Sequence, residues 1–248
     1  MMIEEWILPG KESEVRYRVQ IYIPEQSPPP EGFPVIYVLD GHMYFGYGAD
    51  VIRNQSFNAS KTGIEPAIIV GIALEAEDAI IRERRFYDFT PPAAVYKYPD
   101  RFKGVTIDKH GGADIFLDWI IGELQPKVVE SYPVQSDKQC LYGHSLGGLF
   151  TLYSMFKRPE AFQCYLAISP SIWWNEKHIY SFVNDVKESK LFMGVGKEEG
   201  FMVEDATAFY HSLPSGLEER ASCYVAEGEN HASVVPTTMS RAFRYFFQ

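Results

Sequence analysis

The 248-residue chain has little cysteine and few basic side chains. Its three cysteines show no CxxC spacing, which favours reduced structural thiols over a disulfide framework or a redox motif. Lys and Arg number 23 against 33 Asp and Glu, so the formal net charge is −10. A chain this acidic repels phosphate backbones, and we therefore expect no nucleic-acid partner.

Signals of export and of membrane insertion are also missing. Residues 1–6 form neither a basic n-region nor an apolar h-region, and no apolar run approaches the length of a membrane span. We therefore predict a cytoplasmic protein with no membrane partner; an exported protein whose leader has been removed is the alternative. No Gly/Ser-rich or Pro-rich linker separates two balanced halves, so we expect one domain over residues 1–248. The sequence predicts no particular oligomeric state.

Short apolar runs alternate along the chain with amphipathic stretches. Residues 14–23 alternate apolar and polar side chains, as a half-buried strand near a sheet edge does. Runs typical of parallel strands buried on both faces follow at 33–39, 67–72, 139–142, 164–168 and 191–195. Apolar residues at helical spacing occupy 114–132, 146–156, 202–213 and 236–247. This order predicts an α/β protein with a central, mostly parallel sheet and helices on both faces.

Prolines and one irregular segment refine this prediction. We expect Pro126 to kink the helix at 114–132, and Pro236 to stand at the first position of the last helix. Residues 73–112 show no clear periodicity and are rich in charge, proline and aromatics. We expect this segment to form a lid or a pocket wall.

The strongest motif is Gly143-His144-Ser145-Leu146-Gly147, a match to G-x-S-x-G. It lies between a predicted strand and a predicted helix, as it does in the nucleophile elbow of the α/β-hydrolase fold. Side chains two residues before and after the serine would collide with the sharp turn, so we expect glycine to be needed at 143 and 147. A chance match at a Gly-rich helix start is the alternative. We predict that Ser145 is the nucleophile of an α/β-hydrolase.

A serine hydroxyl needs a base to take its proton. The α/β-hydrolase fold places nucleophile, acid and histidine in this chain order, so the base must follow Ser145. His231 follows the predicted strand at 221–226 and precedes the last helix, in a loop that can reach the strand ends. His178 and His211 lie in helical stretches, where we expect them to be surface or packing residues. We predict His231 as the base.

The acid should follow the predicted strand at 191–195. Glu199 stands three residues after Gly196, a common placing in this fold, and a carboxylate there could hold the tautomer of the base. Glu198 is the close rival, with Glu204 and Asp205 behind it. The alternative is that all four are solvated surface acids.

Two backbone N–H groups should form the oxyanion hole. Leu146, the residue after the nucleophile, supplies one. The loop after the strand at 33–39 supplies the other, and there we predict the N–H of His42, with Gly41 leaving room for the backbone to approach. The histidines lack metal-ligand spacing, so we expect no metal and no organic cofactor.

Four segments together resemble one known family: residues 35–41, 143–148, 169–174 and 230–236. They are similar to the "Putative esterase" family of α/β-hydrolases, which includes esterase D-like enzymes, feruloyl esterases and mycolyltransferases. The similarity spans about residues 20–248, and it is greatest to the siderophore trilactone esterases that hydrolyse enterobactin, salmochelin or bacillibactin. The resemblance implies the same roles for Ser145, His231, His42 and Leu146. It supports Glu199 less, because some siderophore esterases work with a Ser-His dyad.

The resemblance also implies a small-molecule ester substrate, which we expect to be an anionic ferric siderophore. Arg84 and Arg85 are candidate substrate-binding residues because guanidinium groups pair well with anionic oxygens. Trp173 and Trp174 are further candidates, as walls against aromatic rings. The alternative for the arginines is that one of them bridges Asp88 and the others are solvated. The alternative for the tryptophans is that they belong to the core.

We therefore expect a cytoplasmic serine esterase that cleaves siderophore trilactones or similar esters through an acyl-enzyme intermediate. A general carboxylesterase acting on acylated sugars or phenolic esters is the second hypothesis. A catalytically silent binding protein with a hydrolase fold is the third.

Overall fold

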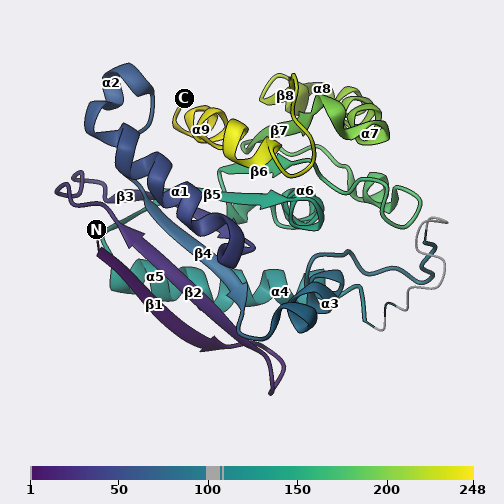
Figure 1. The fold of residues 1–248 in the computed structure, drawn as a ribbon, viewed down its shortest axis with the longest axis horizontal. Coiled ribbons are helices and arrows are strands. Elements are labelled where there is room, and N and C mark those ends of the chain that lie inside the picture. Colours follow the sequence, from purple (N-terminus) through teal and green to yellow (C-terminus); the bar gives the residue numbers. More distant parts are fainter. Residues whose placement is uncertain (1, 99–106, 108) are drawn as a thin grey trace.

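A computed structural model describes residues 2–98, 107 and 109–248, and its strands form one eight-stranded sheet (Figure 1). The strand order is β1-β2-β4-β3-β5-β6-β7-β8. β2 pairs antiparallel with both β1 and β4, and every other neighbouring pair is parallel. The strands are β1 (Met2–Pro9), β2 (Arg16–Ile23), β3 (Phe33–Leu39), β4 (Ile68–Leu74), β5 (Val134–His144), β6 (Cys164–Ile168), β7 (Lys190–Gly196) and β8 (Ala221–Ala226). The predicted mostly parallel sheet is confirmed.

Helices cover both faces of this sheet, which explains why strands such as β3 and β4 are apolar throughout. In β3, Val35 and Tyr37 lie in one buried cluster, while the intervening Ile36 lies in the other. Helices α1 and α9 pack on the second face, through Phe45 and Phe243. The longer helices are α1 (Gly41–Gln55), α3 (Asp78–Asp88), α4 (Ala113–Trp119), α5 (Gln125–Ser131), α6 (Leu146–Lys157), α7 (Phe201–His211) and α9 (Val234–Phe247). Two single turns, α2 (Ala59–Thr62) and α8 (Ser215–Glu218), complete them.

Two helical regions that contain a proline differ from the prediction in detail. Helix α9 begins at Val234, so Pro236 is its third residue and the predicted first position is wrong. A proline is tolerated there because the first-turn N–H groups have no partner within a helix. Between α4 and α5 the chain forms a π-helical segment, Ile120–Leu124. The wider turn lets the helix continue past Pro126, which has no N–H to donate.

Among the longer elements, β1, α1 and α3 were not predicted from the sequence, and neither were the single turns α2 and α8. Helix α1 contains three glycines, which weaken its helical propensity, and it is stabilised by packing on β4 instead. Helix α3 lies within residues 73–112. Residues 99–106 and 108 of that predicted lid or pocket wall lie outside the described residues.

Candidate active site

Ser145 occupies the turn between β5 and α6 in a strained backbone conformation, with φ 59° and ψ −119°. Its N–H donates a hydrogen bond to the carbonyl of Ile168 at 2.9 Å. A Cβ at Gly143 would lie 2.2 Å from the Gly147 carbonyl oxygen, so glycine is required at 143. At Gly147 a Cβ would have ordinary contacts, the nearest at 3.5 Å, so that half of the prediction is wrong. The crowded neighbour is Gly148, whose Cβ would lie 2.9 Å from the Ile168 oxygen.

His231 reaches this turn from the loop between β8 and α9. Its Nε2 lies 3.1 Å from Ser145 Oγ, within hydrogen-bond distance. The side chain of Asn230 holds the loop by accepting hydrogen bonds from the N–H groups of Ala232 and Ser233, at 2.9 and 3.2 Å. The His231 side chain is 45% exposed, so an ester that reaches Ser145 can also reach its ring.

Glu199 approaches the other nitrogen of His231 from a 3-10 turn, Lys197–Glu199, that follows β7. Its Oε2 lies 2.5 Å from His231 Nδ1. Its Oε1 accepts hydrogen bonds from Ser169 Oγ at 2.5 Å and from the Gly196 N–H at 2.6 Å. Burial raises the pKa of the Glu199 carboxyl, but the three hydrogen bonds outweigh burial and the pKa lies below its ordinary value. The carboxylate therefore stays ionised although its side chain is only 1% exposed.

The rival acids lie in different surroundings. Glu198 and Glu204 are exposed to solvent. Asp205 forms an ion pair with Lys177 at 2.6 Å. Among the four predicted candidates, Glu199 is the one whose carboxylate contacts His231.

The two predicted oxyanion N–H groups lie at helix starts. His42 is the second residue of α1 and Leu146 the first of α6, and first-turn N–H groups have no partner within their helix. A Cβ at Gly41 would lie 2.7 Å from the backbone of Gly71, so glycine lets the β3–α1 turn pass close to β4. The side chain of Asp40 approaches Gly147 of the elbow, which places the two helix starts side by side.

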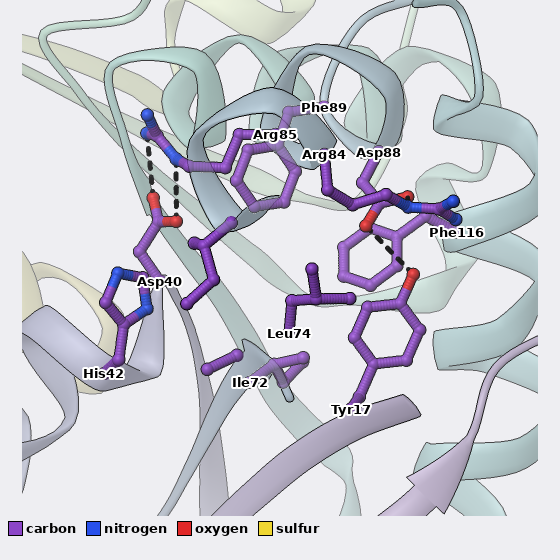
Figure 2. Close-up of a pocket in the computed structure, with 12 residues that line it drawn as sticks. Tyr17, Asp40, His42, Ile72, Leu74, Arg84, Arg85, Asp88, Phe89 and Phe116 are labelled. Atoms are coloured by element: carbon purple, nitrogen blue, oxygen red, sulfur yellow. Dashed lines mark hydrogen bonds and ion pairs between the residues drawn. The ribbon is translucent and has the colours of Figure 1, made fainter. Parts of the chain in front are cut away.

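Arg84 and Arg85 lie on α3 and are held by internal ion pairs (Figure 2). Arg85 donates two hydrogen bonds to Asp40, at 2.8 and 3.0 Å. Arg84 donates to Asp88 at 2.8 Å, and Asp88 also accepts a hydrogen bond from Tyr17. The Arg–Asp88 bridge, which was the alternative to substrate binding by these arginines, is therefore present. The cavity between these pairs measures about 20 Å³, too small for a substrate ring.

The two predicted tryptophans have different exposures. Trp174 is 1% exposed and packs in the core against Phe86 and Tyr98, with ring centroids 5.6 and 5.4 Å away. Trp173 is half-buried. It follows Ser171 by two residues, and the Ser171 hydroxyl lies 3.4 Å from Ser145 Oγ.

His144 packs beside the nucleophile, and its contacts were not predicted from the sequence. Its Nδ1 lies 2.9 Å from the Tyr44 hydroxyl, and its ring centroid lies 4.5 Å from that of His231. Burial, and then the neighbouring His231 and Arg85, lowers the pKa of His144 to about 3. The ring is therefore neutral at physiological pH. The other side chains that sequence reasoning missed are Ser169 and Ser171, although both lie in a segment that carries the family resemblance.

In residues 2–98, 107 and 109–248, no group of three or more His, Cys, Asp or Glu could hold a metal ion. No helix in the same ranges is both long and apolar enough to cross a bilayer.

A serine at a strained strand-to-helix turn, with an imidazole and a carboxylate from two later strand ends, defines a hydrolase of the α/β-hydrolase fold. The family model "Putative esterase" matches residues 10–242, and the chain belongs to this esterase family. The predicted family and the predicted ester hydrolase are confirmed.

Named relatives agree with this assignment. The chain is 37% identical over 243 residues to ferri-bacillibactin esterase BesA of Bacillus subtilis, covering 92% of this chain and 84% of that one. It is 36% identical over 249 residues to the siderophore triacetylfusarinine C esterase of Aspergillus fumigatus, covering 87% and 82%. The crystal structure of the BES protein from Bacillus cereus superposes with a TM-score of 0.88 at 38% identity, covering 98% and 95%.

Proposed function

We propose that this protein is a serine esterase that hydrolyses siderophore ester bonds, with Ser145 as nucleophile, His231 as base and Glu199 as acid. One observation carries the chemistry: Ser145 Oγ, both nitrogens of His231 and the Glu199 carboxylate form a continuous hydrogen-bonded line. That line supplies what a serine hydroxyl needs, a base to take its proton and an acid to orient the base.

In the first step Ser145 Oγ attacks the ester carbonyl carbon while its proton passes to His231 Nε2. The N–H groups of His42 and Leu146 stabilise the negative charge on the carbonyl oxygen, assisted by the N-termini of α1 and α6. The tetrahedral intermediate then breaks its C–O bond. The alcohol leaves with the proton from His231, and the acyl group stays on Ser145.

Water completes the cycle by the reverse proton path. His231 takes a proton from water, the hydroxide attacks the acyl carbon, and the carboxylic acid leaves as Ser145 regains its proton. Glu199 stays ionised throughout and stabilises the imidazolium that forms in each step.

The names of the relatives support siderophore esters as substrates. Two of them, from a bacterium and a fungus, are named as esterases of siderophores and align with more than four fifths of this chain. Trp173 remains a proposed substrate contact, because it is partly exposed and lies close in sequence to Ser171 at the nucleophile. We also propose a cytoplasmic location, supported by the free thiols of Cys140, Cys164 and Cys223.

Two substrates and four proteins test this function. Wild-type protein, Ser145→Ala, His231→Ala and the control His211→Ala, an exposed residue of α7, are assayed on a ferric siderophore trilactone and on an acetylated sugar. We expect trilactone cleavage by the wild type and His211→Ala, and a loss of about 10⁴-fold or more in kcat for the other two. Faster cleavage of the sugar ester would favour a general carboxylesterase. Unchanged rates in Ser145→Ala would refute the mechanism.

A further inference from the structure

The turn Ser169-Pro170-Ser171 after β6 has no role in the mechanism above, yet it lies against the whole site. Ser169 and Ser171 are 0% and 1% exposed. The Ser169 N–H donates to the Gly194 carbonyl of β7 at 2.6 Å, and the Ser171 N–H donates to the Ser145 carbonyl at 3.0 Å. One turn is therefore attached to both the strand that leads to the acid and the residue that acts as nucleophile.

Ser169 is oriented toward the acid. It has φ 43°, in the left-handed region where a residue with a Cβ is rarely found. Its hydroxyl donates to Glu199 Oε1 at 2.5 Å, while the other carboxylate oxygen contacts His231. A short hydrogen bond to an ionised acceptor is stronger than a neutral one. The bond restricts rotation of the carboxylate and keeps Oε2 directed at the imidazole.

Ser171 is oriented toward the nucleophile. Its hydroxyl lies 3.4 Å from Ser145 Oγ, at the limit of hydrogen bonding, and Ser145 Oγ also contacts His231 Nε2. Because Ser171 is only 1% exposed, we expect a substrate that reaches Ser145 not to touch it. Its hydroxyl can restrict the rotamer of Ser145 without contributing to substrate affinity.

We propose that Ser169 and Ser171 are positioning residues, which set the acid and the nucleophile of the triad from a single turn. The inference rests on the proposed function, since positioning has meaning only if Ser145, His231 and Glu199 react. Ser169 acts through Glu199, and Ser171 acts through Ser145.

A double-mutant cycle tests Ser169 with an activated ester such as p-nitrophenyl acetate. Ser169→Ala should lower kcat roughly tenfold with little change in KM, the effect of one hydrogen bond to a charged group. In a Glu199→Ala background the same change should lower kcat less than about twofold, because its target is gone. Ser169→Gly also lacks the hydroxyl but suits a positive φ, so it should match Ser169→Ala even if the alanine variant is unstable.

Ser171→Ala should lower kcat roughly fivefold at unchanged KM, as expected for lost orientation of a nucleophile. The control for both residues is Ser189→Ala, which removes a buried hydroxyl bonded to the carbonyls of Pro159 and Phe162, away from the site. Its kcat should equal that of the wild type.

Three results would overturn the proposal: a kcat for Ser169→Gly equal to the wild type, an equal loss in the Glu199→Ala background, or a Ser171→Ala defect confined to KM. Failure of the proposed function itself looks different. In that case the wild type is inactive, or Ser145→Ala retains its rate.

Discussion

Glu198 and Glu199 are adjacent carboxylates with opposite surroundings. The Glu199 side chain is 1% exposed and accepts three hydrogen bonds, whereas Glu198 is exposed. Glu199→Gln removes the charge that stabilises the imidazolium of His231, and we expect kcat to fall by about 10³-fold or more. Steady-state kinetics on an activated ester measures this effect. Glu198→Gln is the matched control and should stay within about twofold of the wild type; equal losses would deny Glu199 its role.

His144 should make stability depend on pH. Its pKa is about 3 in the folded protein against an ordinary 6.5, so between these values the unfolded chain binds one more proton. The unfolding free energy therefore rises with pH, by up to about 1.4 kcal/mol per unit, and this contribution is lost as pH falls toward 3. The free energy of unfolding can be measured by urea denaturation at several pH values from 4 to 6.5. It should rise less steeply with pH for His144→Gln than for the wild type. An equal rise with pH in the two proteins would contradict a buried neutral ring at His144.

Some residues of the site could be predicted and others could not. Ser145 and His231 were predictable because a local motif and the chain order of the fold locate them. The hydroxyl of Ser169 was not, because its partner Glu199 is 30 residues away and nothing local marks the pair. The steric role of Gly147 was predicted wrongly, since only the structure shows that Gly148 is the crowded position.

The elbow depends on the absence of one side chain. A Cβ at Gly143 would meet the Gly147 carbonyl oxygen at 2.2 Å and Thr151 Oγ1 at 2.6 Å. The carbonyl belongs to the first turn of α6, so it cannot move without shifting the start of that helix. We expect Gly143→Ala to cost about 3 kcal/mol or more of unfolding free energy and most of the activity. Thermal unfolding and ester hydrolysis measure both effects.

Helix α1 offers a control in which a Gly→Ala substitution should raise stability instead of lowering it. A Cβ at Gly46 would meet no atom within 4 Å, and glycine is a poor residue for a helix interior. Gly46→Ala should therefore stabilise the protein by about 0.5–1 kcal/mol at unchanged activity. If both alanine variants destabilise alike, steric crowding at the elbow is not the cause.

Whole elements were predictable where burial produced a pattern. The continuous apolar runs in β3, β4, β6 and β7 follow from burial on both faces. Strand β1 was not predicted because it lies at the sheet edge, where most of its residues are exposed. Neither of its faces has to be apolar, so its sequence lacks a regular pattern. Helix α3 was not predicted because it is short and rich in charged residues, with few apolar positions to form a pattern. Ion pairs such as Arg84–Asp88 help to stabilise it.

At the scale of the molecule, the sheet gathers the site from distant parts of the sequence. Parallel strands β5, β7 and β8 end at the same edge, so the residues that follow them meet there although they are up to 86 positions apart. The shape of the site therefore depends on the sheet register as a whole.

The net charge of −10 acts over the same scale and should oppose the approach of anionic substrates. The predicted substrate-binding cations Arg84 and Arg85 do not offset it, because they are paired with Asp88 and Asp40. Salt screens long-range repulsion, with a Debye length of about 10 Å at 0.1 M. We therefore expect kcat/KM for a ferric tricatecholate trilactone to rise a few-fold between about 10 mM and 0.3 M NaCl. A neutral p-nitrophenyl ester should show no change under the same conditions. A fall with salt for the ferric complex alone would instead require attraction by a local basic patch that outweighs the charge of the whole chain.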